Sequence, residues 1–160
     1  MPPAGGAASS IGPDQARGGT LAKNQYHEHL EQIPLFRGLD EDELNAVGQT
    51  ATELDYEAGR VLMREGARAH EMFVLMEGSV EVTRDGEHVA DIGAGGFVGE
   101  MALLAHSPRT STVTAKTDVV VLHIDGREFG TLMVRVPEIA SKMLPIVAAR
   151  VVENTDHHSH

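Results

Sequence analysis

The middle of the chain alternates short runs of apolar and β-branched residues with single glycines. The runs lie at 60–64, 72–76, 79–84, 87–92, 110–115 and 119–124, and glycines recur between the first four of them. In the third run Val80 and Val82 alternate with polar neighbours, as the two faces of a half-buried strand require. Asp85-Gly86 predicts a two-residue hairpin turn between the third and fourth runs. Short strands at even spacing with glycine turns predict an antiparallel barrel or jelly roll over about 52–125.

Helical patterns flank this β-rich region on both sides. A first helix is predicted over about 21–32, where Pro34 ends it, and a second over about 40–50. Asp40 and Glu43 have the spacing of a capping box at the start of the second helix. After the strands, a short helix is predicted over 126–134 and a longer one over 137–153. The fold class is therefore α+β, mainly β, with an antiparallel jelly-roll barrel between N-terminal and C-terminal helices.

The longer closing helix has an apolar face and an internal proline. Pro145 is expected to kink the helix or to mark a break in it. The residues that share the apolar face are Ile139, Met143, Ile146, Val147 and Val151.

Length and composition restrict the class of protein. A chain of 160 residues is long enough for one domain, which we expect over 21–153. Residues 1–20 are rich in Gly and Pro and are expected to form a flexible leader, and 154–160 to form a disordered tail. A formal net charge of -11 argues against a nucleic-acid partner. No signal peptide, membrane span or cysteine occurs, so we expect no membrane partner and a cytoplasmic location.

The segment 93–113, GAGGFVGEMALLAHSPRTSTV, carries the candidate chemistry. Its glycines let the backbone approach a ligand closely. It is a near miss to the dinucleotide fingerprint GxGxxG, which we reject because Val98 occupies the last glycine position and no crossover fits before the next strand. A short helix over 100–105 would direct unpaired N–H groups at the glycine loop, which favours an anionic ligand.

Two charged residues of this segment suggest the ligand's chemistry. The guanidinium of Arg109 has parallel donors that suit two phosphate oxygens. An ionised Glu100 only accepts hydrogen bonds, so it fits a sugar hydroxyl better than a phosphate. Together they suggest a ligand with a phosphodiester and a ribose, and the alternative is a structural turn with a surface arginine.

The segment resembles the phosphate-binding cassette of the cyclic nucleotide-binding domain family. The resemblance rests on FVGEMALL at 97–104 and PRTSTV at 108–113, and it extends from about Leu30 to Val152. It implies that Arg109 holds the cyclic phosphate, that Glu100 accepts the ribose 2′-hydroxyl, and that the residue after the arginine contacts the phosphate or the purine. Val98 between Phe97 and Gly99 departs from the family pattern, as does the lack of an aromatic residue in the closing helix.

The residues that the resemblance assigns to ligand binding are Gly99, Glu100, Met101, Ala102, Arg109, Thr110 and Ser111. Candidates for a lid over the base are Ile146, Val147 and Arg150. We expect no catalytic residues and no metal site, since the terminal histidines are interpreted as part of the tail.

The predicted function is a stand-alone sensor that binds a 3′,5′-cyclic purine nucleotide. Cyclic AMP is favoured over cyclic GMP because arginines outnumber lysines, as in GC-rich bacterial genomes. Few residues follow Glu153, so a helix-turn-helix, kinase, channel or acyltransferase domain is not expected there. The signal would pass through the C-terminal helix to an effector protein or a second copy. Two alternatives stay open, a scaffold that binds no nucleotide and a cupin-like jelly-roll enzyme.

Overall fold

The computed structural model describes residues 23–158, with side chains over 27–153. Eight strands of this part of the chain form two four-stranded antiparallel sheets. The strands are β2 (Thr52–Tyr56), β3 (Val61–Met63), β4 (Glu71–Glu77), β5 (Val80–Arg84), β6 (Glu87–Ile92), β7 (Phe97–Val98), β8 (Thr112–Ala115) and β9 (Val119–Asp125). The predicted leader, residues 1–20, lies outside the described residues.

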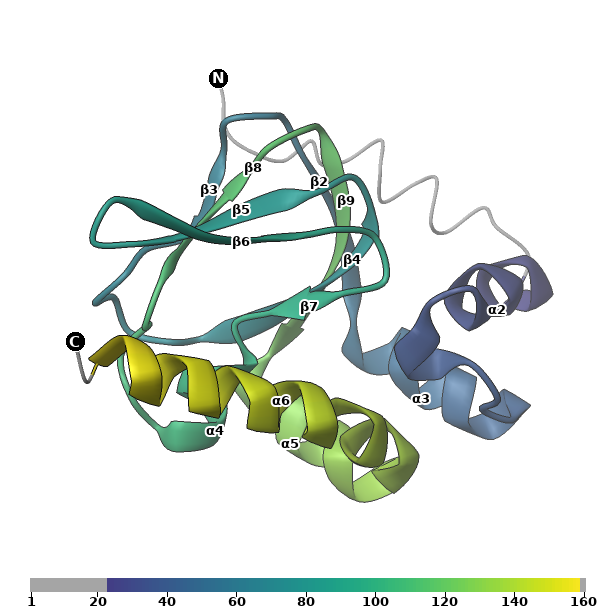
Figure 1. The fold of residues 1–160 in the computed structure, drawn as a ribbon. Helices are drawn as coiled ribbons and strands as arrows, with labels where there is room; N and C mark the ends of the chain where they lie inside the picture. The colour runs from purple at the N-terminus through teal and green to yellow at the C-terminus, as the bar shows by residue number, and fades with distance from the viewer. Residues whose placement is uncertain (1–22, 159–160) are drawn as a thin grey trace.

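The two sheets enclose an apolar core and form the predicted barrel (Figure 1). The first has the order β2-β9-β4-β7 and the second the order β3-β8-β5-β6. Between them lie side chains such as Phe73, Leu75, Val80 and Val121, each at most 2% exposed. The fold class, a mainly antiparallel β structure with flanking helices, is thus confirmed.

The predicted hairpin joins β5 to β6. Arg84 pairs with Glu87, so Asp85 and Gly86 form the two-residue turn. Both have a positive φ, 55° and 81°, as a type I′ turn requires. Among non-glycine residues, Asp is one of those enriched at positive φ, so it is compatible with the first position of this turn.

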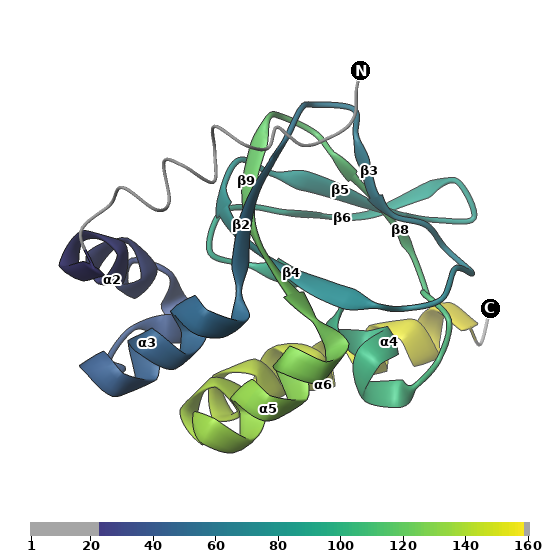
Figure 2. The same ribbon diagram turned by 180° about the vertical axis from the view of Figure 1, so that it is seen from behind.

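The helices are α2 (Lys23–Glu31), the 3-10 turn η1 (Pro34–Phe36), α3 (Glu41–Thr50), α4 (Glu100–Ala105), α5 (Gly126–Arg135) and α6 (Pro137–His158). The capping box is confirmed, because Asp40 accepts from Glu43 N at 2.8 Å and Glu43 accepts from Asp40 N at 2.9 Å. A second apolar core joins the helices to the outer side of β4, through residues such as Phe36, Leu132 and Ile139. Figure 2 shows α5 and α6 side by side below the barrel.

Three details of the last helix differ from the prediction. It runs to His158 instead of ending at Glu153, so the predicted tail is helical over 154–158. It does not break at Pro145, which is exposed, so water can hydrogen-bond to the carbonyl that proline leaves unpaired. Ile146 and Val151 are 43% and 47% exposed and do not belong to its buried face.

Candidate functional site

The cassette segment connects β7 to β8 through α4. Gly99 begins it with φ 94°, in the left-handed region, and His106 ends α4 with φ 52°. A Cβ on Gly99 would lie 2.8 Å from Met63 Cε and 3.0 Å from Arg109 Nη1. Glycine is therefore required here by both conformation and space.

A cavity with about 100 Å³ of free space lies between this segment, the β5–β6 hairpin and α6. All seven ligand-binding candidates line it, and they come together as the sequence predicts. The remaining lining residues are Met63, Val82, Arg84, Val89, Ala90, Ile92, Val98, Val113, Arg150 and Glu153. The cavity thus combines an apolar wall on the β5–β6 side with charged groups near α4 and α6.

The lid candidates do not all reach this cavity. Arg150 lines it, whereas Ile146 is exposed and Val147 packs on the helical core. Glu153, which sequence reasoning missed, lines it one helical turn after Arg150. Ile146 lies one helical turn before Arg150 on the same side of α6, and neither it nor Val147 lines the cavity.

Both the backbone and the side chain of Arg109 form hydrogen bonds within the protein. Its backbone N–H donates to Ala67 O and its carbonyl accepts from Gly66 N, both at 2.8 Å. Nη1 of its side chain donates to Gly99 O at 2.8 Å, and Nη2 donates to both the carbonyl and the Oε2 of Glu71 at 2.6 Å. The side chain is only 2% exposed, so this is an ion pair at the edge of the core.

Glu71 is a site residue that sequence reasoning missed. It is the first residue of β4, and its carboxylate lies between Arg109 and His123, whose Nε2 is 3.7 Å from Oε1. The His123 imidazole, 3.7 Å away, has the largest effect and lowers the pKa of Glu71; burial opposes it, and the positive charge of Arg109 adds to the lowering. Its only sequence signal is a carboxylate that opens an apolar strand.

Glu100 is fully buried and pairs with α6. Nη1 of Arg150 donates to Oε1 and Oε2 of Glu100, at 2.8 Å each. The Arg150 guanidinium also lies 4.7 Å from the centre of the Phe97 ring, a cation–π contact. An ion pair therefore links α6 to Glu100, the residue that the family resemblance assigns to the ribose.

A third arginine supports the end of the cassette. Arg84, the last residue of β5, is 7% exposed. Its Nε donates to Thr110 O at 3.0 Å and its Nη2 to Ser111 Oγ at 2.9 Å. These bonds link the β5–β6 hairpin to the two residues that follow Arg109.

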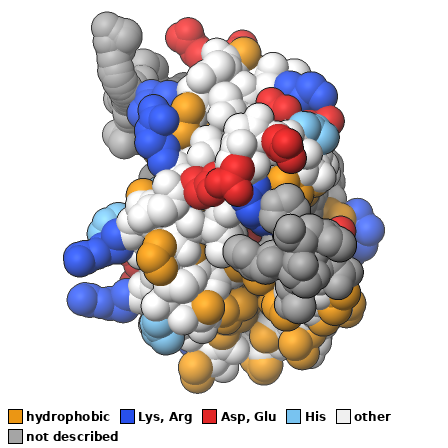
Figure 3. All heavy atoms as spheres, turned by 60° about the vertical axis from the view of Figure 1, so that its left-hand side comes forward, with side chains coloured by type: hydrophobic (Ala, Val, Ile, Leu, Met, Phe, Trp, Pro, Cys, Tyr) orange, Lys and Arg blue, Asp and Glu red, His pale blue; other side chains and the backbone are white. Residues whose placement is uncertain are grey.

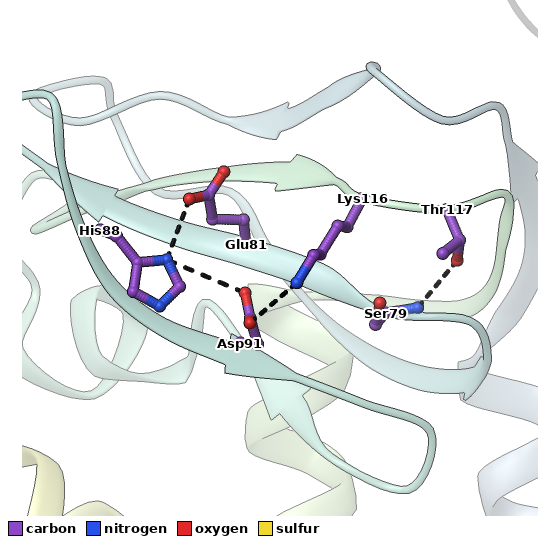
Figure 4. Close-up of polar contacts among 6 residues, drawn as sticks. All are labelled: Ser79, Glu81, His88, Asp91, Lys116 and Thr117. Carbon is purple, nitrogen blue, oxygen red and sulfur yellow. Dashed lines mark hydrogen bonds and ion pairs between the residues drawn. The ribbon is translucent and has the colours of Figure 1, made fainter.

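A separate polar cluster lies on the outer surface of the second sheet (Figure 4). His88 Nδ1 is 2.9 Å from Glu81 Oε2 and 3.9 Å from Asp91, which pairs with Lys116 at 2.9 Å. The β5–β6 register shifts at Val89, so His88 is opposite Thr83 and lies with Glu81 and Asp91, and it does not line the cavity. No group of three or more His, Cys, Asp or Glu side chains in the described part of the chain is placed to hold a metal ion. Among the described helices, none is long and apolar enough to cross a membrane.

The structure is a jelly-roll module whose cavity is lined by a buried arginine and a buried carboxylate from one cassette. The chain belongs to the cyclic nucleotide-binding domain family, whose profile matches residues 53–135. Domains of this family sense ligands and do not catalyse a reaction, which removes the jelly-roll enzyme as an alternative.

Similar proteins are parts of channels and kinases. The chain is 34% identical over 143 residues to a cyclic nucleotide-gated potassium channel of Rhizobium etli. The aligned region covers 82% of this chain and 40% of the channel. The chain is 28% identical over 109 residues to a cAMP-dependent protein kinase regulatory subunit of Schizosaccharomyces pombe, covering 68% of this chain and 26% of the subunit. The chain thus spans less than half the length of these curated relatives.

Solved structures have the same fold. PfPKA-R with cAMP bound has a TM-score of 0.71 at 22% identity, covering 83% of this chain and 46% of that one. The catabolite activator protein of Thermus thermophilus has a TM-score of 0.67 at 24% identity, covering 79% and 62%.

Proposed function

We propose that this domain binds a 3′,5′-cyclic purine nucleotide, preferably cyclic AMP, in the cavity between the cassette and α6. The observation that carries the proposal is that Glu100 and Arg109 line one cavity, as a ligand with a ribose and a phosphodiester requires. Arg109 would hold the phosphate, and Glu100 would accept the 2′-hydroxyl. The first-turn N–H groups of α4 have no intrahelical partner and would face the phosphate.

The remaining parts of the cavity suit a purine. Val82, Val89, Ala90 and Ile92 offer an apolar wall on β5 and β6, on the far side of the cavity from α4. The hydroxyl of Thr110 would contact the phosphate or the base edge. Cyclic GMP is the alternative ligand, because a hydroxyl can either donate or accept.

Binding would move α6. The free space of about 100 Å³ is smaller than the several hundred Å³ typical of ligand pockets, and Arg150 forms part of its wall. A 2′-hydroxyl that bonds to Glu100 competes with the two hydrogen bonds from Arg150. Ligand binding therefore favours an arrangement in which α6 shifts relative to α4, and this shift of populations is the proposed signal.

The receiver of the signal would contact the outer face of α6, either as an effector protein or as a second copy. Leu144 and Val152 are 64% and 59% exposed there, and Val134 on α5 is 81% exposed. Figure 3 shows apolar side chains gathered on the lower part of the face in view, where α4, α5 and α6 lie. Exposed apolar side chains gathered in one area are typical of contact surfaces.

Isothermal titration calorimetry with cyclic AMP, cyclic GMP and 5′-AMP tests the binding proposal. We expect micromolar or tighter binding of a cyclic form and no heat with 5′-AMP. Arg109→Gln should weaken the binding at least tenfold, whereas Arg135→Gln, at an exposed position on α5, should not change it. Absence of binding to both cyclic nucleotides would refute the proposal and favour the scaffold that binds no nucleotide.

The movement of α6 has its own test. The sequence contains no cysteine, so cysteines introduced at the exposed positions Glu87 and Ala149 would be the only sites for spin labels. We expect the distance between the labels to change on addition of the bound cyclic nucleotide. An unchanged distance distribution at saturating ligand would refute signalling through α6 while leaving the binding proposal intact.

A further inference from the structure

The carboxylate that holds Arg109 is shared with a histidine. Oε2 of Glu71 is 2.6 Å from Arg109 Nη2, and Oε1 of the same group is 3.7 Å from His123 Nε2. His123 is opposite Phe73 in the β4–β9 register, so its side chain points to the same side of the sheet as Phe73 and Glu71. Its ring contacts the Phe73 ring edge-on, with centroids 5.6 Å apart.

The charged and titratable groups around His123 lie on three strands or pack against them. On β4, Glu71 faces it, and Arg109 lies behind Glu71. On β2, Thr52 is its direct partner, and Tyr56 lies on the same side of that strand with the guanidinium of Arg60 5.1 Å from its ring centre. On β9 itself, Asp125 is on the same side but accepts from Glu128 N at the start of α5.

We propose that His123 is a positioning residue for the phosphate site, because its charge determines through Glu71 how tightly the protein holds Arg109. Ligand affinity would then depend on pH. This inference rests on the proposed function, since it concerns the same arginine. Histidine is the side chain that ordinarily changes its charge between pH 5 and 8.

The direction of the effect follows from the geometry. A protonated imidazole attracts the Glu71 carboxylate, which then interacts less strongly with Arg109. Arg109 is thereby easier to turn toward a phosphate, and the added positive charge also favours an anionic ligand. Affinity should rise as the pH falls, and by linkage the complex should take up protons when it forms. The lowered pKa of Glu71 supports this, because the carboxylate is then charged across this pH range and can interact with both neighbours.

Calorimetric titration of the full chain with cyclic AMP and cyclic GMP from pH 5.5 to 8.0 tests the inference. We expect the affinity to increase about fivefold from pH 8.0 to pH 6.0, at the low end of couplings between sites. Titrations in buffers of different ionisation enthalpy should show net proton uptake on binding.

Two substitutions of His123 and one control separate coupling from structural damage. His123→Gln, and His123→Phe, which keeps a ring against Phe73, should each abolish both the pH dependence and the proton uptake. His88→Gln removes a histidine that is also paired with a glutamate, at 2.9 Å from Glu81, but lies outside the site (Figure 4). This control should keep the full pH dependence.

The outcomes are distinguishable. Binding with the same pH dependence in wild type and both His123 variants would overturn the role of His123 and leave the proposed function intact. Loss of the pH dependence in His88→Gln would also overturn it. If wild type binds neither cyclic nucleotide at any pH, the proposed function is overturned, and the role of His123 with it.

Discussion

Replacing Arg150 by methionine should lower the free energy of unfolding by about 2–4 kcal/mol. Met keeps much of the apolar length of the arginine but cannot donate a hydrogen bond. Breaking a buried ion pair by removal of one partner costs roughly 3–5 kcal/mol, because the other charge stays buried without compensation. Glu100 is 0% exposed and loses two hydrogen bonds of 2.8 Å. The Arg150 side chain is 22% exposed, so water can reach part of the gap, and this places the expected loss at the lower end.

A double-mutant cycle measures the pair itself. Glu100→Gln with Arg150→Met should lose about 1–3 kcal/mol less than the sum of the two single variants, since the buried charge is removed together with its partner. Urea unfolding at pH 7 and 0.15 M salt gives each free energy, provided that the slope with urea stays constant. Arg135→Met on α5 is the control for losing an exposed arginine.

Two results would refute this reasoning. The first is a loss of less than about 0.5 kcal/mol for Arg150→Met, which is the range of ordinary surface substitutions. The second is strict additivity in the cycle. Either would mean that α6 is not attached to α4 through Glu100 in solution.

Three other predictions concern Arg109, the carboxylate that pairs with it, and Gly99. Arg109→Gln should weaken cyclic nucleotide binding by about 1.5–3 kcal/mol, measured by calorimetry. The pKa of Glu71 is lower in the folded protein than its ordinary value of 4.5, so the charged carboxylate stabilises the fold above about pH 4.5. This contribution is lost as the pH falls below that value and through the lower folded pKa. Glu71→Gln should therefore flatten the decrease of thermal stability below about pH 4.5. Gly99→Ala should weaken both folding and ligand binding, because its Cβ would meet Arg109 and Met63. Gly59→Ala, at φ 92° in open space, should cost only the roughly 1 kcal/mol of the left-handed conformation and leave binding unchanged.

The local features of this fold could be predicted because their determinants are close in sequence. Asp40 and Glu43 are three residues apart, and Asp85-Gly86 specifies its own turn. The cassette residues from Gly99 to Ser111 are nearly contiguous, so any compact path of the chain brings them together. All seven candidates accordingly line one cavity, which Val98 and Val113 of the same segment also line.

The partners of the charged groups could not be predicted, because strand register and helix rotation decide them. Glu71 meets His123 only because Phe73 and His123 are paired across β4 and β9. The exposed side of α6 carries apolar residues, such as Leu144 and Val151, as its buried side does. The hydrophobic pattern therefore does not determine which side faces the barrel. Of the three lid candidates, Arg150 lines the cavity, whereas Ile146 and Val147 do not.

The two ion pairs of the site explain how binding and movement would be coupled. Both groups assigned to the ligand are already engaged, Arg109 by Glu71 and Glu100 by Arg150. A ligand therefore exchanges contacts instead of adding them, and its net affinity is smaller than the sum of its own hydrogen bonds. For every 1.4 kcal/mol by which the Arg150–Glu100 pair favours the present position of α6 over the shifted one, the apparent affinity for the ligand falls tenfold. The same free energy is what the ligand must overcome to move α6, so a weaker pair should give tighter binding and a smaller response.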